Sequence, residues 1–202
     1  MADEHEGHEN DEIIVPQIME RRYVPASLKS VAWEGFNFVG HEIKIVESTD
    51  LYGAFVWPSA LVLCYFLEKH GKQLCIEDKN IIEIGSGTGL VAIVACLLGA
   101  QVVATDLEEL IGNLQYNILR NTKMKSDVVY NHPYLEELLE TLDHLCSENS
   151  TILWVMRFRK ENTLQENAFI QKFQKLFDME VIFDLPSLSI KLYRARRHNQ
   201  QK

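Results

Sequence analysis

The hydrophobic pattern of the chain is clearest between residues 80 and 107. Ile81, Ile82 and Ile84 form a short apolar run of the kind found in a strand that is covered on both faces. Residues 90–98 are almost wholly apolar and predict a buried helix, and residues 101–107 predict a second strand. The order is therefore strand, turn, helix, strand, as at the start of an α/β fold with a parallel sheet.

Three glycines, Gly85, Gly87 and Gly89, lie in the turn between the first strand and the helix. Glycine has no Cβ, so the backbone can turn sharply there and a ligand can approach it closely. Asp106 lies at the end of the second strand. A glycine-rich turn before a helix, followed by an acid at the next strand end, is typical of a site for the ribose of a nucleotide. Ordinary turn chemistry is the alternative explanation for the glycines alone.

The spacing of the turn narrows the choice of nucleotide. A dinucleotide site has the spacing G-x-G-x-x-G, whereas this turn has G-x-G-x-G, with Leu90 in place of the third glycine. The carboxylate of Glu83, just before the turn, would repel a pyrophosphate but suits a ligand with an amino group and a sulfonium. Glu83 and Leu90 therefore disfavour an NAD-binding oxidoreductase. E-x-G-x-G-x-G with Asp106 after it resembles the S-adenosylmethionine (SAM) site of class I, seven-strand methyltransferases.

That resemblance implies an α/β fold with a Rossmann-like sheet that ends in an antiparallel hairpin. The rest of the pattern agrees, because helical or strand-like segments recur along the chain. They are a hairpin at 31–47, helices at 59–70, 108–122, 133–145 and 161–177, a strand at 151–158, and strands at 180–185 and 189–193 for the terminal hairpin.

Several motifs in a fixed order make the resemblance narrower. They are Y-G-A-F-V-W-P from Tyr52, E-I-G-S-G-T-G-L-V from Glu83, A-T-D-L from Ala104, G-N-L-Q-Y-N from Gly112 and S-D-V-V-Y from Ser126. Together they resemble the methyltransferase-like 21 subgroup of class I protein-lysine methyltransferases, over residues 25–193.

The resemblance implies a role for each candidate site residue. The residues that would bind SAM are Trp57, Glu83, Gly85, Gly87, Gly89 and Asp106. Among them, Asp106 would hold the ribose hydroxyls and Glu83 would lie near the methionine end. Asp127 and Tyr130 are the ends of the D-x-x-Y motif, which in the family ends the fourth strand and faces the methyl donor and the incoming lysine. Core packing is the alternative for Trp57, and a helix cap or a solvated charge is the alternative for Asp127.

The implied partner is a lysine of a folded protein, which in the family is a chaperone, an AAA-type ATPase or a translation elongation factor. Only the neutral amine attacks, and a free lysine has a pKa of about 10.4. An apolar channel would lower that pKa by desolvation, and alignment of the amine, methyl and sulfur would supply most of the rate. Asp127 would orient the amine or ease its deprotonation, and Tyr130 would form a channel wall or a hydrogen bond. The sequence shows no metal-ligand pattern, and the reaction requires none.

One departure from the family is large. In a class I domain, the helix predicted at 108–122 is followed by a third strand, another helix and a fourth strand before D-x-x-Y. A strand–crossover–strand unit takes about 30 residues or more, so about 30–35 residues are missing near 122–126. The missing part would hold the third strand, contacts to the adenine ring and most of the fourth strand, which pairs with the first. Residues 123–130 could form at best a stub of that fourth strand.

The gap leaves a second function open. Without the fourth strand, the first strand would have an unpaired edge, which is an aggregation hazard. The alternative to an active lysine methyltransferase is therefore a catalytically inactive isoform or pseudoenzyme that acts as a protein-interaction module.

Composition suits one domain with a sizeable core. The 202 residues are 47% hydrophobic, and the net charge of −9 disfavours tight binding to nucleic acid. No apolar run approaches the roughly 20 residues that span a membrane, and four scattered cysteines suit a reducing compartment. We expect a monomer in the cytoplasm or also in the nucleus. Residues 1–24 are expected to be a disordered acidic tail, 25–193 the methyltransferase domain and 194–202 a basic tail.

Overall fold

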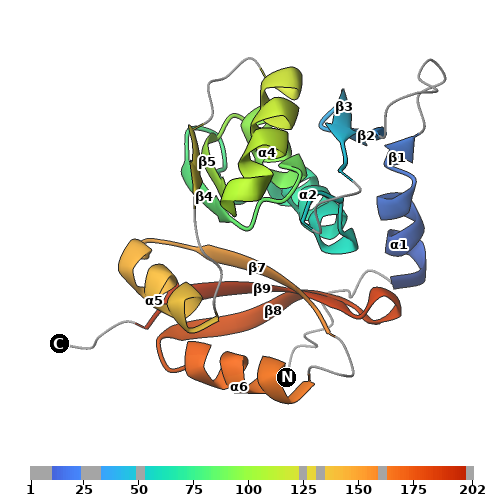
Figure 1. The fold of residues 1–202 in the computed structure, drawn as a ribbon. Coiled ribbons are helices and arrows are strands. Elements are labelled where there is room, and N and C mark those ends of the chain that lie inside the picture. The colour runs from blue at the N-terminus through green and yellow to red at the C-terminus, as the bar shows by residue number, and fades with distance from the viewer. Residues whose placement is uncertain are drawn as a thin grey trace. The chain divides into compact units, whose positions relative to one another are not determined.

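The computed structural model of the chain describes residues 11–23, 33–48, 53–122, 127–130, 135–158 and 163–198. They belong to two compact units, Gln17–His132 and a second unit that joins Met1–Pro16 to Pro133–Lys202, where the sequence predicted one domain. The elements of the first unit are β1 (Arg22–Tyr23), β2 (Trp33–Phe38), β3 (His41–Val46), α2 (Pro58–His70), β4 (Asn80–Ile84), α3 (Leu90–Leu97), β5 (Gln101–Asp106), α4 (Glu108–Asn121) and β6 (Asp127–Tyr130). Those of the second are α5 (Leu135–Leu145), β7 (Ile152–Arg157), α6 (Thr163–Phe173), β8 (Phe177–Leu185), the 3-10 turn η2 (Pro186–Leu188) and β9 (Ile190–Arg197), while α1 (Asp11–Met19) crosses the boundary (Figure 1).

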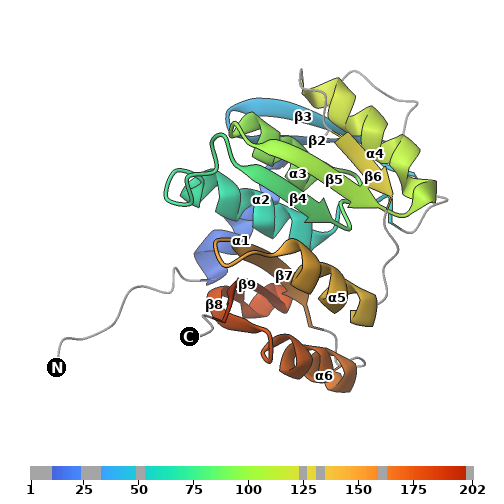
Figure 2. The same ribbon diagram turned by 90° about the vertical axis from the view of Figure 1, so that its left-hand side faces the viewer.

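Strands β4, β5 and β6 form a parallel sheet with β5 in the middle (Figure 2). β4 pairs with β5 along its whole length, from Asn80 opposite Gln101 to Ile84 opposite Thr105. Between them, α3 buries seven consecutive residues, 90–96, because a helix that is apolar all round has no face for water. The predicted order of strand, glycine turn, helix and strand is confirmed.

The strand that carries D-x-x-Y pairs differently from the prediction. β6 lies beside β5, with Asp127 opposite Val103 and Tyr130 opposite Asp106. The sequence predicted at best a stub of the family's fourth strand, which pairs with the first strand, and an unpaired edge on that first strand; β6 does not pair with β4. The chain leaves β5, passes through α4 and returns as the parallel strand β6 beside β5, as consecutive strands of a sheet commonly do. Among the described strands β4 pairs with β5 alone, so its other edge has no described partner.

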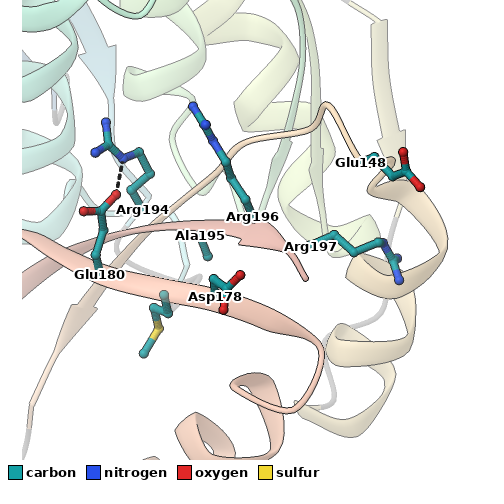
Figure 3. Close-up of a pocket in the computed structure, with 8 residues that line it drawn as sticks. Glu148, Asp178, Glu180, Arg194, Ala195, Arg196 and Arg197 are labelled. Atoms are coloured by element: carbon teal, nitrogen blue, oxygen red, sulfur yellow. Dashed lines mark hydrogen bonds and ion pairs between the residues drawn. The ribbon is translucent and has the colours of Figure 1, made fainter. Parts of the chain in front are cut away.

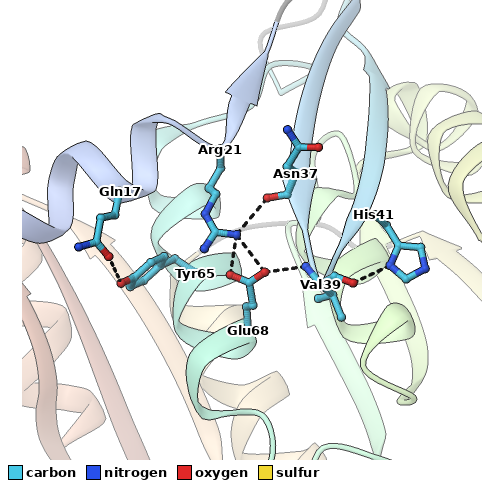
Figure 4. A network of polar contacts seen from close by, with 7 residues as sticks. All are labelled: Gln17, Arg21, Asn37, Val39, His41, Tyr65 and Glu68. Carbon is cyan, nitrogen blue, oxygen red and sulfur yellow. Dashed lines mark hydrogen bonds and ion pairs between the residues drawn. The ribbon is translucent and has the colours of Figure 1, made fainter.

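The hairpin predicted at 31–47 is formed by β2 and β3, with a two-residue turn at Val39 and Gly40. Both turn residues have positive φ, 54° and 70°, as the twist of a tight hairpin requires. A β-branched residue is unfavourable in this region of φ. Glu68 on α2 compensates, because its Oε1 accepts a hydrogen bond from Val39 N at 2.6 Å (Figure 4).

Residues 11–23 form α1 and β1, although the sequence places them in a disordered tail. Ile14 and Ile18 explain the helix, since residues four apart share one helical face and both side chains are buried. The sequence did not predict this helix because the segment before it is acidic and because Pro16, a residue that disfavours helix interiors, lies within it. Residues 1–10 and 24 lie outside the described part of the chain.

The chain from Gln17 onward is held to α2 by polar contacts (Figure 4). Tyr65 donates a hydrogen bond from its hydroxyl to Gln17 Oε1 at 2.9 Å. Arg21 forms an ion pair with Glu68, with Nη1 2.7 Å from Oε2, and both side chains are largely buried. This pair, together with the hydrogen bond from Val39 N to Glu68, attaches β1 and the β2–β3 hairpin to α2.

The second unit is an antiparallel sheet in the order β7–β9–β8, with α5 and α6 against it (Figure 1). Phe169 and Phe173 on α6 and Phe177 on β8 are buried together with Ala195. The Trp154 ring lies 5.2 Å from that of Phe169, edge to face. The predicted terminal hairpin is confirmed as β8 and β9, and the phenylalanines are core residues as the sequence predicted.

The arginines near the C-terminus differ from the prediction of a basic tail. They lie in β9, which extends to Arg197. Arg194 donates from Nε to Glu180 at 2.6 Å, and Arg197 donates from Nη1 to Asp143 at 2.7 Å. Strand pairing with β8 and these ion pairs extend the hairpin into the predicted tail. Among the described helices, none is long and apolar enough to cross a membrane.

Candidate functional site

The turn after β4 has a left-handed backbone at its three glycines. Gly85, Gly87 and Gly89 have φ values of 71°, 54° and 84°, which side chains rarely adopt. A Cβ on Gly87 would lie 3.0 Å from the carbonyl oxygen of Gly53, whereas a Cβ on Gly85 would meet no atom within 4 Å. The turn is therefore tightly packed at Gly87 and open at Gly85, where there is room for a ligand.

Two hydroxyl side chains hold the turn against β5. Ser86 N donates to Thr105 O at 2.9 Å, and Thr105 N donates to Ser86 Oγ at 3.2 Å. Thr105 Oγ1 also donates to Glu83 O at 2.8 Å. Sequence reasoning missed both residues. The available signal was a serine inside a glycine turn, because serine readily bonds to nearby backbone there.

Asp106 is buried at the end of β5 and faces the turn. Its Oδ2 accepts a hydrogen bond from Gly87 N at 2.5 Å, and its Oδ1 accepts one from Leu107 N at 2.7 Å. A carboxylate offers about four acceptor positions, so about two remain for the hydroxyls of a ligand. The structure thus brings Asp106 and the glycine turn together.

Glu83 has an enclosed carboxyl group without a full set of partners. Its Oε2 is buried and has no hydrogen-bond partner. Burial raises the pKa of Glu83 to about 8, against the lowering effect of hydrogen bonds from the Ser86 side chain and the Ala92 amide. The group is therefore mainly protonated at neutral pH, and a nearby cation would favour its charged form.

Trp57 lies at the start of α2, with the extended backbone of an N-cap and Pro58 after it. Its carbonyl accepts hydrogen bonds from Ala60 N and Leu61 N. The segment before it lies against the glycine turn, because a Cβ added to Gly87 would be 3.0 Å from Gly53 O. The structure thus brings the chain segment of Trp57 to the turn, and the indole is half-buried.

The strand register places the two ends of D-x-x-Y at different depths. Tyr130 is opposite Asp106, at the end of the sheet that carries the turn. Asp127 is opposite Val103, three residues or about 10 Å toward the other end. The structure therefore brings the backbone of Tyr130 level with the site and leaves that of Asp127 further away. The side chains of both residues lie outside the described part.

A separate hollow of about 320 Å³ lies on the β8–β9 hairpin (Figure 3). Its lining residues are Glu148, Asp178, Met179, Glu180, Arg194, Ala195, Arg196 and Arg197. Three acids and three arginines balance one another there, and Arg194 is paired with Glu180. The hollow contains none of the predicted site residues. Across the described residues, no group of three or more histidines, cysteines and acids could hold a metal ion.

Sequence comparison decides the family. The model of the family described as lysine methyltransferase matches residues 38–126 and 124–176. The chain belongs to the lysine methyltransferase family. The family match divides at residues 124–126, where the sequence predicts the missing segment.

Named relatives of this lysine methyltransferase family agree with the match. The chain is 54% identical to protein-lysine methyltransferase METTL21E of Mus musculus over 225 aligned residues, with 96% of this chain and 91% of the relative covered. It is 52% identical to the putative methyltransferase-like protein 21E pseudogene of Homo sapiens, with 95% and 82% covered. Protein N-lysine methyltransferase METTL21A of Mus musculus is 32% identical, with 83% and 88% covered. An alignment of 225 positions exceeds the 202 residues of this chain, so part of METTL21E has no counterpart here.

Solved structures show the fold. The chain is similar to the 16S rRNA N2 G1207 methyltransferase RsmC of T. Thermophilus in complex with AdoMet and guanosine, with a TM-score of 0.60 and 17% identity. That match covers 87% of this chain and about half, 53%, of RsmC. SMU.776, a putative methyltransferase complexed with SAH, has a TM-score of 0.58 at 12% identity, with 85% and 58% covered. The class I methyltransferase fold predicted from the sequence is confirmed.

Proposed function

We propose that this chain binds SAM at the turn after β4 and transfers its methyl group to a lysine of a folded protein. The observation that carries the proposal is the open turn at Gly85, between the unsatisfied carboxyl of Glu83 and the carboxylate of Asp106. Membership in the lysine methyltransferase family supports the reaction class.

The residues around the turn fit the chemistry of SAM. Asp106 has acceptor positions left for ribose hydroxyls, and Gly85 has no atom close enough to obstruct a ligand. The buried Oε2 of Glu83 lacks a partner and suits the positive charge of an amino group or a sulfonium. When bound, SAM supplies a methyl group on a positively charged sulfur. Gly87 and Gly89 hold the turn, and Trp57, at the start of α2, is proposed to contact the bound SAM.

The D-x-x-Y residues are proposed to serve the lysine. Tyr130, level with Asp106, is suited to form a wall of the lysine channel. Asp127 is proposed to orient the amine or ease its deprotonation. Desolvation by an apolar channel would lower the pKa of the lysine and raise the fraction of reactive neutral amine. The net charge of −9 favours a substrate whose lysine lies on a basic surface. We propose a chaperone, an ATPase or an elongation factor as the substrate type.

One observation favours a second function, that of a non-catalytic interaction module. β6 lies beside β5 rather than β4, so D-x-x-Y is not at the strand edge where the family places it. A chain of this kind could keep the SAM site and lose alignment of the lysine, on which most of the rate depends.

The deciding experiment is thermal unfolding of the full chain with and without saturating S-adenosylhomocysteine (SAH). A ligand that binds only the folded state adds about 2.7 kcal/mol at one hundred times its dissociation constant. We expect an upward shift of the midpoint, and its absence would reject SAM binding.

Methyl transfer is then measured with labelled SAM and candidate proteins. Loss of label with Asp127→Asn, but not with Glu109→Gln on the exposed face of α4, would support catalysis. A thermal shift without any methylation would favour the interaction module.

A further inference from the structure

The motif G-N-L-Q-Y-N contains two asparagines that the proposed function does not use. Asn113, Asn117 and Asn121 are spaced four residues apart on α4, so they share one face of the helix. We call these three residues the asparagine ladder. Asn117 is completely buried, and a buried polar amide is costly unless its hydrogen bonds are satisfied.

The ladder pairs with the backbone of β3 along the edge that faces away from β2. Asn117 Oδ1 accepts from Val46 N at 2.8 Å, and its Nδ2 donates to Val46 O at 3.0 Å. Asn121 makes the same two bonds with Lys44, both at 2.8 Å. Four residues of helix advance about 6 Å and two residues of strand about 6.8 Å. Successive asparagines therefore reach every second residue of β3, whose backbone N–H and C=O point away from β2. The asparagine side chains thus form the hydrogen bonds that a neighbouring strand would otherwise form.

Asn117, unlike Asn121, also contacts the glycine turn. Its Nδ2 also lies 3.1 Å from the carbonyl oxygen of Thr88, the residue between Gly87 and Gly89. We propose that Asn117 is a positioning residue for the SAM turn, which it holds through the Thr88 carbonyl. The proposal deepens the proposed function and rests on it for the identity of the ligand.

The orientation of the Asn117 amide is determined by its partners. Oδ1 must face Val46 N because that group is a donor. The two hydrogens of Nδ2 then face three acceptor oxygens, those of the Val46 and Thr88 carbonyls and Asn113 Oδ1, so at least one of these bonds is shared. A rotated amide would place its oxygen against two carbonyls. Asn117 therefore connects β3, α4 and the turn in one arrangement.

The packing beside Thr88 makes the turn sensitive to α4. A Cβ on Gly89 would lie 2.7 Å from Leu114 Cδ1 and 3.2 Å from Ile118 Cγ1, and both of these side chains are on α4. Because there is no spare space between helix and turn, a small shift of α4 moves the turn. Asn117 lies between Leu114 and Ile118 along the helix, so its bond to Thr88 can fix the distance between α4 and the turn.

The test compares Asn117→Ala with Asn121→Ala in the full chain. Both remove a two-bond contact to β3, but only the first removes the bond to Thr88. We expect both to lower the unfolding midpoint. Asn117→Ala should weaken SAH binding at least tenfold by calorimetry, and Asn121→Ala should leave it within about twofold. Equal losses of affinity, or an Asn117→Ala chain that binds SAH normally, would overturn the proposal.

Amide hydrogen exchange of the ligand-free chain tests the role of Asn117 without any need for SAH to bind. The amides of Gly87 and Gly89 are hydrogen bonded, to Asp106 Oδ2 and Ser86 O, so their exchange reports on the turn. They should exchange faster in Asn117→Ala and not in Asn121→Ala. If Asn117→Ala does not fold, Asn117→Ser, whose shorter side chain also lacks the Nδ2 donor to Thr88, should show the same effect. Unchanged exchange at both glycines would reject the positioning role of Asn117. If the unmutated chain does not bind SAH, the proposed function is rejected but the role of Asn117 in the turn is still tested by exchange.

Discussion

The carboxyl of Glu83 shows how one residue can be poorly suited to the fold yet well suited to a ligand. It is enclosed beside the N-terminal part of α3, and burial raises its pKa from the usual 4.5 to about 8. Because burial disfavours the charged form, ionised Glu83 makes the folded state less stable, not more stable. As pH rises from 4.5 to about 8, the unfolded state ionises while the folded state stays protonated, so stability falls.

Glu83→Gln should therefore stabilise the ligand-free chain more at high pH than at low pH. Each pH unit between the two pKa values is worth about 1.4 kcal/mol, and glutamine keeps the shape of the neutral acid. Unfolding midpoints of both chains measured at pH 5 and pH 8 would check this. A gain that is the same at both pH values would contradict a raised pKa.

Alanine substitutions at Gly85 and Gly87 should have different effects on stability and on ligand binding. Gly85→Ala and Gly87→Ala both impose a left-handed conformation on alanine, at about 1–2 kcal/mol each. Gly87→Ala adds contact with Gly53 O, so it should lower the free energy of unfolding by more than Gly85→Ala. Gly85→Ala should mainly reduce SAH affinity, because its methyl group enters the open space. Denaturant titration and SAH calorimetry on both variants separate the two effects.

Among the elements, the β2–β3 turn contains a residue that is poor for its conformation. Val39 has a φ of 54°, where asparagine is several-fold better tolerated than a β-branched side chain. Val39→Asn should raise the free energy of unfolding by up to about 1 kcal/mol. The control is Gly40→Ala, which places alanine at a φ of 70° and should destabilise. Chemical denaturation measures both, and a destabilised Val39→Asn chain would show that packing of valine outweighs backbone strain.

Sequence reasoning works for elements whose signal is local and fails where pairing decides. The apolar run of α3 and the alternation in β2 and β3 identify these elements without any knowledge of their neighbours. Val128 and Val129 suit either edge of the sheet, so the partner of β6 cannot be read from them. The roles of Ser86 and Asn117 are also hidden, because each depends on a backbone atom distant in sequence.

At the scale of the whole molecule, the cofactor residues belong to one of two units. Trp57, Glu83 and Asp106 all lie within Gln17–His132. Hydrogen exchange with and without SAH should therefore show added protection at residues 80–122 and little at residues 152–197. Ligand binding stabilises the unit that contains the site, and an independent unit receives no part of that free energy. Equal protection across both ranges would show that the units unfold as one.

The division into units also has a consequence for synthesis on the ribosome. Every described strand pair of the first unit lies between Arg22 and Tyr130, so no part of its sheets waits for the C-terminal third of the chain. Nascent chains fold from the N-terminus as domains emerge. The glycine turn, its two acids and the asparagine ladder can thus assemble while β7, β8 and β9 are still untranslated.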